Sequence, residues 1–207
     1  MHLRHLCGLV GVALVLQLGT AEAKGPLKGE YSKEEILANA KELAQEVGMS
    51  FDKRDAVLDR LQVMLSENWT SKYGEGEEGK IRGLFAYQMG EGGLLVKVKK
   101  GHGRVRFVGS RESHDIELKS VSWGAVIGGS SEWGFGLVLG LGDESYFGGK
   151  YDGKSIGATA ATASTNTTEL RRKGSDVRED HRVVLIGTAA GLSANAAGAT
   201  LNIKVKK

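Results

Sequence analysis

GFGLVLGLG, which runs from Gly134 to Gly142, alternates glycine with large apolar residues. Successive side chains of a β-strand point to opposite faces, so the alternation predicts a strand with two unlike faces. One face carries Phe135, Leu137, Leu139 and Leu141, and the other carries Gly134, Gly136, Gly140 and Gly142 with only Val138 among them. A face without side chains lets a backbone or a helix approach closely, or lets a sheet bend as sharply as a small barrel requires.

Glycine is abundant in the whole chain. It accounts for 31 of 207 residues, about twice its usual ~7%, and there is a single proline and no collagen period. Glycines in the segment before residue 134 support the interpretation of a curved, closed sheet. We assign a structural role to six positions: Gly124, Gly128, Gly134, Gly136, Gly140 and Gly142.

Two patterns in this region are typical of nucleotide-binding proteins. GFGLVLGLG resembles a dinucleotide fingerprint, and GGKYDGKS, Gly148 to Ser155, satisfies the phosphate-loop pattern GxxxxGK[ST]. Both motifs need a strand that runs into a glycine turn and then into a helix. Residues 156–168 are instead β-branched and alternating, a poor start for a helix. We therefore interpret residues 151–155 as a turn between strands and expect no nucleotide cofactor.

Two amphipathic helices are predicted between residues 24 and 80. Ser32 and Glu35 match a capping box, and apolar residues then recur at helical spacing until Gly48. A second segment begins near Asp52 and carries an apolar stripe formed by Val57, Leu58, Leu61, Met64, Leu65 and Trp69. Both stripes are expected to pack on the rest of the domain.

From residue 81 onward the apolar period changes from 3.6 to 2, which is typical of strands. Short strands are predicted over 83–89, 94–100 and 103–109, then over 116–129, 132–142, 154–164 and twice within 182–205. Residues 165–181 are charged and poor in apolar residues, and they predict an exposed loop. The predicted fold class is α+β, with two N-terminal helices (24–80) packed on a small, strongly curved, mostly antiparallel, glycine-rich β-barrel (81–207) in one domain.

Residues 1–23 have the pattern of a cleavable signal peptide. Arg4 precedes an almost wholly apolar run over 6–18, and Ala21-Glu22-Ala23 forms a cleavage site. The prediction is export to the periplasm or secretion. The only cysteine, Cys7, lies inside this segment, so the remainder offers no disulfide, thiol nucleophile or cysteine metal site.

Catalytic patterns are scarce. Gly129-Ser130-Ser131-Glu132 does not complete a GxSxG pattern, and there is no HExxH sequence. His102, His114 and His181 stand singly in what are predicted to be polar turns. Asp143, Glu144 and Asp152 could meet near a strand end and hold a cation, but turn capping is their expected use. We expect a noncatalytic protein without a bound metal or cofactor.

Two groups of basic residues could bind lipid or another anion: Lys97, Lys99, Lys100, Arg104 and Arg106 around a hairpin, and Arg171, Arg172 and Lys173 in the charged segment. A lysine or arginine near an anionic membrane is worth about 1 kcal/mol. The alternative is a solvated edge whose charges prevent strand-to-strand aggregation. The formal net charge of +3 does not indicate a nucleic-acid partner.

Several sequence blocks resemble known families. Residues 90–95, 122–128, 137–143 and 155–158 resemble, in order, the GEGxLL, SxGxxxG, LVL and LGA blocks of the SYLF lipid-binding domain family. Residues 31–36 and 191–203 are more similar to the EipA-type bacterial cell-envelope integrity proteins. In two respects the chain departs from these patterns: residues 165–181 replace a glycine-alanine-rich run, and there is no lipoprotein cysteine.

The resemblance implies a small β-barrel with helices alongside, a periplasmic location, no catalytic site, and a role in envelope integrity or lipid association. Membrane lipid and an anionic envelope polymer are the implied partners. Two other functions stay open from the sequence. The first is a carrier of a small apolar ligand inside the barrel, which needs a cavity of ~300 Å³ or more, and the second is a hydrolase or nucleotide-binding protein.

Overall fold

The structure, a computed structural model, describes residues 26–66, 76–92, 96–123, 131–156, 167–173, 181–187 and 199–206. The predicted signal segment lies outside these residues. Two helices, α1 (Lys33–Glu46) and α2 (Phe51–Ser66), come first. The strands are β1 (Ile81–Gly92), β2 (Val96–Phe107), β3 (Ser113–Trp123), β4 (Ser131–Leu139), β5 (Gly149–Ile156), β6 (Thr167–Arg172), β7 (Arg182–Gly187) and β8 (Ala199–Val205). Two 3-10 turns, η1 (Glu77–Gly79) and η2 (Glu144–Tyr146), precede β1 and β5.

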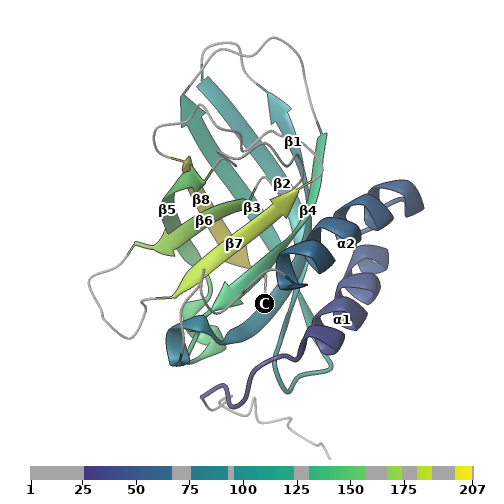
Figure 1. Ribbon diagram of the computed structural model, residues 1–207. Helices are drawn as coiled ribbons and strands as arrows, with labels where there is room; N and C mark the ends of the chain where they lie inside the picture. The colour runs from purple at the N-terminus through teal and green to yellow at the C-terminus, as the bar shows by residue number, and fades with distance from the viewer. Residues whose placement is uncertain are drawn as a thin grey trace, which may run out of the picture.

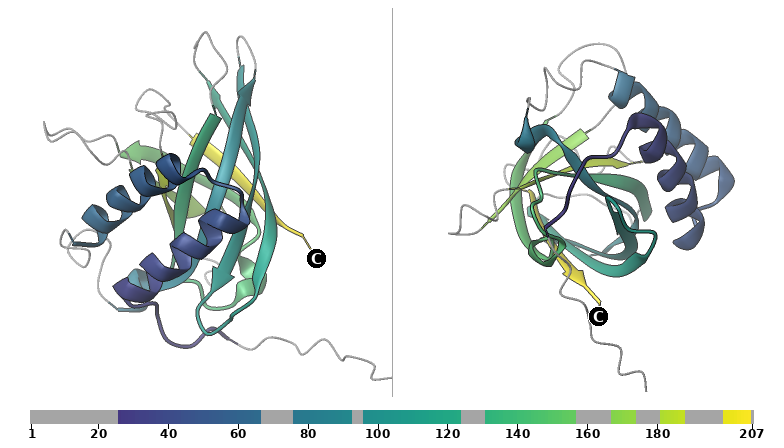
Figure 2. Two further views of the ribbon diagram at one scale, coloured as in Figure 1. Left: turned by 90° about the vertical axis from the view of Figure 1, so that its right-hand side faces the viewer. Right: turned by 90° about the horizontal axis from the view of Figure 1, so that it is seen from below.

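The eight strands form a closed barrel in the order β1-β2-β3-β8-β5-β6-β7-β4, and all neighbours are antiparallel. Both helices lie on one side of this barrel (Figures 1 and 2). The predicted fold class, α+β with two helices packed on a small antiparallel barrel, is confirmed.

The predicted start of α1 is also confirmed. The Ser32 hydroxyl accepts a hydrogen bond from the Glu35 N–H at 3.2 Å, and the Glu35 carboxylate accepts one from the Ser32 N–H at 2.8 Å. These bonds satisfy two of the N–H groups that a helix N-terminus otherwise leaves without partners. Gly48 follows the helix with φ of 74°, a left-handed conformation that favours glycine.

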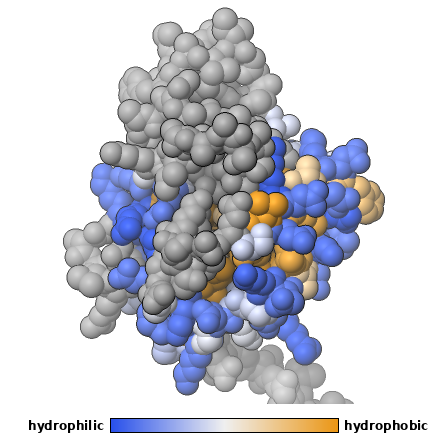
Figure 3. All heavy atoms as spheres, viewed as in Figure 1, coloured by the Kyte–Doolittle hydropathy of each residue, from blue (hydrophilic) through white to orange (hydrophobic). Residues whose placement is uncertain are grey.

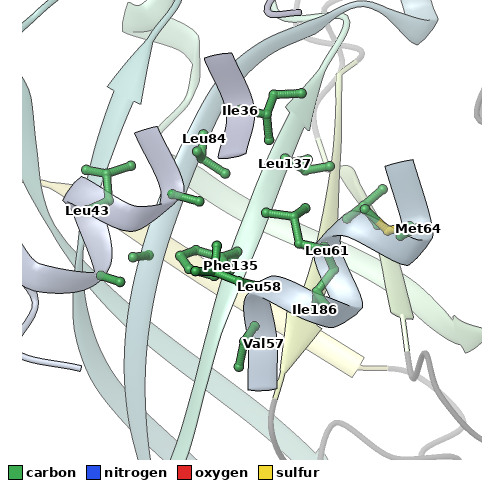
Figure 4. Packing of buried hydrophobic residues seen from close by; sticks show 14 of the residues in the cluster. Ile36, Leu43, Val57, Leu58, Leu61, Met64, Leu84, Phe135, Leu137 and Ile186 are labelled. Atoms are coloured by element: carbon green, nitrogen blue, oxygen red, sulfur yellow. The ribbon is translucent and has the colours of Figure 1, made fainter. Parts of the chain in front are cut away.

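The helices pack on the outer face of β1, β4 and β7 through one apolar cluster. The helices contribute Ile36, Ala40, Leu43, Val57, Leu58, Leu61, Met64 and Leu65, and the strands contribute Leu84, Phe135, Leu137, Leu139, Val184 and Ile186. Figure 4 shows side chains of this cluster meeting between the layers, among them Leu61, Phe135 and Leu137, and Figure 3 shows apolar residues gathered around the helices. Trp69, predicted to extend the α2 stripe, lies outside the described residues.

The two faces of GFGLVLGLG have different neighbours. Phe135 and Leu137 face the helices, whereas Gly134 and Gly136 face the barrel interior. A Cβ at Gly136 would overlap the Phe85 ring, and one at Gly134 would lie 2.6 Å from Cζ of Tyr87. The absent side chains therefore make room for aromatic rings inside the barrel rather than for a helix.

The remaining predicted structural glycines differ in role. Gly140 follows β4 with φ of 71°, and after this turn Leu141 lies in the barrel interior. The alternation had predicted that Leu141 would share the helix-facing side with Phe135, so this part of the prediction is wrong. Gly142 has no atom within 4 Å of where its Cβ would be, and it has no positive φ. Gly124 and Gly128 lie outside the described residues.

The barrel interior is filled by a second apolar cluster over its described length: Phe85, Tyr87, Met89, Val105, Phe107, Ile116, Leu118, Val138, Leu141, Phe147, Tyr151, Leu170, Val183, Leu185, Leu201 and Ile203. Phe147, just after η2, has its ring centroid 5.8 Å from that of Phe85 and 5.4 Å from that of Phe107. Leu27 packs against the same cluster, and its N–H donates to the Gly142 carbonyl at 2.8 Å.

Three strand predictions need correction. Residues 101 and 102, predicted to separate the strands over 94–100 and 103–109, continue β2 without a break, because Gly101 and Gly103 let β2 lie against the backbone carbonyls of β1 where a Cβ would collide. Residues 151–155, also predicted as a turn, belong to β5, which pairs with both β6 and β8. The predicted loop 165–181 contains β6, whose Thr168 and Leu170 are buried.

Candidate functional site

Exposed lysines form a row on the outer face of the barrel, on strands β2, β3 and β5. Strand register places Lys100 of β2 opposite Lys119 of β3, Lys119 opposite Asn202 of β8, and Asn202 opposite Lys150 of β5. All four side chains are exposed. Neighbouring strands lie about 4.8 Å apart, so the row spans four strands in a line. We call Lys100, Lys119, Asn202 and Lys150 the lysine row.

The row on one side of the lysine row pairs opposite charges. His102, Glu117 and Lys204 lie opposite one another on β2, β3 and β8, and Lys206 Nζ lies 3.0 Å from the Glu117 carboxylate. The hydrogen bond from Lys206 and the charge of Lys204 hold the pKa of Glu117 below its usual range. Lys100 and Lys119, by contrast, face each other with like charges, which costs roughly 0.2–1 kcal/mol in a sheet.

A hollow of about 570 Å³ lies over this face. It is lined by Lys100, His102, Glu117, Lys119, Asn202, Lys204 and Lys206, together with Gly101 and Leu118. Four ammonium groups and one carboxylate meet there, and the Asn202 amide adds hydrogen-bond donors. Such a lining is chemically suited to an anionic group.

The predicted basic residues lie in several places. Lys100 is in the lysine row, whereas its neighbour Lys99 points into the barrel and is 2% exposed. The side chain of Lys97 lies outside the described residues. Arg104 and Arg106 bind acidic residues of α1, with Arg106 Nη2 2.9 Å from Glu46 Oε1. These last two arginines fasten the helix to β2.

The second predicted basic group is engaged with its own neighbours. Arg172 donates to the Gly148 carbonyl and lies over the Tyr151 ring, with 5.7 Å from its guanidinium carbon to the ring centroid. Lys173 Nζ lies 3.1 Å from Asp152 Oδ2. Arg171 is exposed and lies 3.8 Å from the Glu169 carboxylate. The two predicted basic groups therefore do not form one surface.

Lys99 belongs to a buried polar cluster inside the barrel. Its ammonium donates to Glu132 Oε2 at 2.8 Å, and the Tyr87 hydroxyl donates to Glu132 Oε1 at 3.0 Å. Desolvation, together with the Glu132 charge, raises the pKa of Tyr87 well above its usual value. Gly187 lies beside this cluster, where a Cβ would be 2.6 Å from Glu132 Oε1. The cluster is internal and does not contribute to the lysine row.

The three carboxylates considered for a cation do not come together. Asp143 caps η2, accepting from the Ser145 N–H at 2.9 Å, which is the expected turn-capping role. Asp152 accepts from the Thr200 hydroxyl at 3.0 Å; desolvation raises its pKa, but the hydrogen bonds from Lys173 and Thr200 outweigh this and lower the pKa overall. Within the described part of the chain, no three His, Cys, Asp or Glu side chains are grouped as metal ligands would be.

All three histidines differ from the predicted solvated turns. His181 is buried, and its Nε2 lies 2.7 Å from the Tyr151 hydroxyl. His102 is exposed but lies within β2, and His114 lies within β3, where it packs beside Phe107.

Most of the lysine row was missed from the sequence. One available signal was the alternation of polar with apolar residues in LNIKVKK, residues 201–207, which places Asn202 of the row on one face with Lys204 and Lys206. Lys119 and Lys150 lie in segments where only the pairing of β3, β8 and β5 brings them together.

Comparison with known proteins gives a structural relationship. No family model matches the chain, and no curated protein matches it. A crystal structure of a β-barrel-like, uncharacterized protein from Brucella abortus matches with a TM-score of 0.56 at 18% identity, over 86% of this chain and 95% of that one. The likeness supports the barrel fold. Among the described residues, no helix has both the length and the apolar character to span a bilayer.

Proposed function

We propose that this protein is a noncatalytic, exported envelope protein that supports cell-envelope integrity by docking its lysine row on anionic membrane lipid. The observation that carries the proposal is the row itself: Lys100, Lys119 and Lys150 on one exposed line, with like charges opposed across β2 and β3. Keeping opposed lysines costs stability, and an anionic partner would offset that cost.

The geometry favours shallow, reversible docking. The described residues with large exposed apolar side chains are Phe51 and Val63, both on α2 and away from the lysine row. Attraction would therefore be electrostatic, at about 1 kcal/mol per lysine near an anionic surface. Screening at physiological salt acts over about 8 Å, so only lysines close to the headgroups contribute.

The sequence pattern of residues 1–23 supports export, and the resemblance of residues 90–158 to SYLF blocks and of residues 31–36 and 191–203 to EipA-type proteins supports an envelope role. On this basis we propose membership of that kind of family. The apolar-carrier alternative is not favoured, because the described interior is occupied by packed side chains. The separation of Asp143 and Glu144 from Asp152 likewise does not favour a hydrolase.

The test is vesicle co-sedimentation of the protein without residues 1–23. Phosphatidylcholine vesicles with and without phosphatidylglycerol are compared at about 0.01 M and about 1 M salt, between which the Debye length falls from ~30 to ~3 Å. We expect binding only to anionic vesicles at low salt. Lys100→Gln, Lys119→Gln and Lys150→Gln together should weaken binding roughly 100-fold, since each lysine is worth about 1 kcal/mol.

The matched control removes three exposed lysines of the helical segment, with Lys28→Gln, Lys33→Gln and Lys41→Gln. Both triple variants lose three positive charges. If the control variant still binds anionic vesicles, the weaker binding of the lysine-row variant is due to the position of its lysines and not to net charge. Equal loss in both triple variants would contradict docking through the row. If the protein bound soluble polyglutamate but not vesicles, the partner of the lysine row would be an anionic polymer and not lipid.

A further inference from the structure

A groove of about 1120 Å³ lies beside the end of β8, between that strand and η2. Phe107, Ile203 and Val205 form its apolar lining, and Gly148 and Gly149 add backbone without side chains. The volume is slightly above that of common small-ligand sites, which are 300–1,000 Å³ and apolar with a few polar groups. The groove shares Asn202, Lys204 and Lys206 with the hollow over the lysine row.

The two walls of the groove carry opposite charges. η2 and the residue before it contribute Asp143 and Glu144, and β8 with the residue after it contributes Lys204 and Lys206. His114 joins the walls, with its Nε2 4.0 Å from Glu144 Oε2. Glu144 is largely sheltered, with 13% of its side chain exposed.

We propose that this groove binds a short peptide with free ends, whose ammonium group lies against Asp143 and Glu144 and whose carboxylate lies against Lys204 and Lys206. An apolar side chain of the peptide would lie against Val205 and the backbone of Gly148 and Gly149, which are partly exposed in the groove. A purely anionic ligand would meet the η2 carboxylates, and a purely cationic one would meet the lysines, so a dipolar ligand complements both walls. This inference goes beyond the proposed function, because it does not depend on the lysine row.

The probe is the tripeptide Ala-Leu-Ala with free ends, titrated into the ¹⁵N-labelled protein without residues 1–23. We expect saturable shifts in the amide resonances of residues 143–149 and 202–206. N-acetylation and C-amidation of the peptide should each weaken binding about tenfold, which corresponds to one lost charge-assisted contact of about 1.4 kcal/mol.

Variant and peptide changes identify the wall that each end contacts. Glu144→Gln should weaken the free peptide but have little further effect on the N-acetylated one, because both changes remove the same contact. The double variant Lys204→Gln with Lys206→Gln should likewise weaken binding of the free peptide and have little further effect on binding of the C-amidated peptide. Unchanged amide spectra away from the groove would establish that each variant is folded.

The lysine-row variant separates this inference from the proposed function. Lys100→Gln, Lys119→Gln and Lys150→Gln together should weaken vesicle binding roughly 100-fold and leave peptide affinity unchanged. Absence of saturable shifts at the highest soluble peptide concentration would overturn the groove assignment while leaving vesicle docking intact. Equal affinity for the free and doubly blocked peptides would also overturn it, because the charged walls would then play no part.

Discussion

At the scale of single residues, the Phe85 ring fills the space that a side chain at Gly136, on the neighbouring strand, would need. Phe85 lies opposite Gly136 in the register of β1 and β4, and its fully buried ring covers the glycine. Gly136→Val should lower the free energy of unfolding by more than about 3 kcal/mol, because the new side chain overlaps a ring that packing holds in place. Urea denaturation measures the loss.

The control is Gly142→Val, where a Cβ meets no atom within 4 Å. This exposed position should change stability by about 0.5 kcal/mol or less. Gly136→Ala combined with Phe85→Leu should recover part of the loss of Gly136→Ala alone. Equal destabilisation by the two valine variants would contradict the assigned packing.

Tyr31 provides a prediction for alkaline pH. Burial raises its pKa to about 12, and the nearby Arg106 charge partly opposes this shift. Because the folded pKa lies above the unfolded value of about 10, the stabilisation is complete below pH 10 and is lost as pH rises towards 12. Between pH 10 and pH 12 the free energy of unfolding of the unmodified protein should therefore fall by about 2–3 kcal/mol through Tyr31, and the Tyr31→Phe variant should not show this decrease.

At pH 7 the same variant should be neutral or slightly stabilising, since the Tyr31 hydroxyl has no hydrogen-bond partner among the described residues. Unfolding free energies measured from pH 9 to pH 12 for both proteins provide the comparison. Parallel curves for the two proteins would show that Tyr31 is not the titrating group.

At the scale of elements, the α2 stripe carries much of the contact between helix and barrel. Leu61 is fully buried in the helix-facing cluster, whereas Val63, two residues away, is 38% exposed. Leu61→Ala should cost about 2–5 kcal/mol, because it leaves a cavity between α2 and the strands. Val63→Ala should cost about 0.5 kcal/mol, and thermal unfolding of both variants tests whether α2 packs through this stripe.

Element boundaries show where local sequence is insufficient. The capping box at Ser32 and Glu35 acts within one helical turn, so the start of α1 was predictable. Gly101 and Gly103 are typical of a turn when read locally, yet they lie inside β2 because β1 passes too close for a side chain. The same holds for Gly153 in β5, where a Cβ would overlap the Glu169 carbonyl of β6. Close approach between strands is a tertiary property.

At the scale of the whole molecule, the proposed docking fixes an orientation. The lysine row lies on β2, β3, β8 and β5. Both helices lie on one side of the barrel (Figure 2), where they pack on β1, β4 and β7, and α1 also contacts β2 through Arg104 and Arg106. Cys7 is the only cysteine and lies in the predicted signal segment, so single cysteines can be labelled in the remainder.

An environment-sensitive dye at Asn202→Cys should change its emission when the protein binds anionic vesicles. The same dye at Phe51→Cys, an exposed position at the start of α2, should not change. The reverse result would place the helices, rather than the lysine row, against the lipid.

The sequence by itself determined the class of each main segment. Periods of 3.6 and 2, the capping box and the glycine alternation are properties of neighbouring residues, so they predicted two helices followed by a curved antiparallel barrel. Tertiary structure alone decided which face of GFGLVLGLG meets the helices, that Lys99 is buried while Lys100 is exposed, and that Lys100, Lys119 and Lys150 share one row. These outcomes depend on which strands pair and in which register, and closing the barrel sets that pairing between residues far apart in the chain.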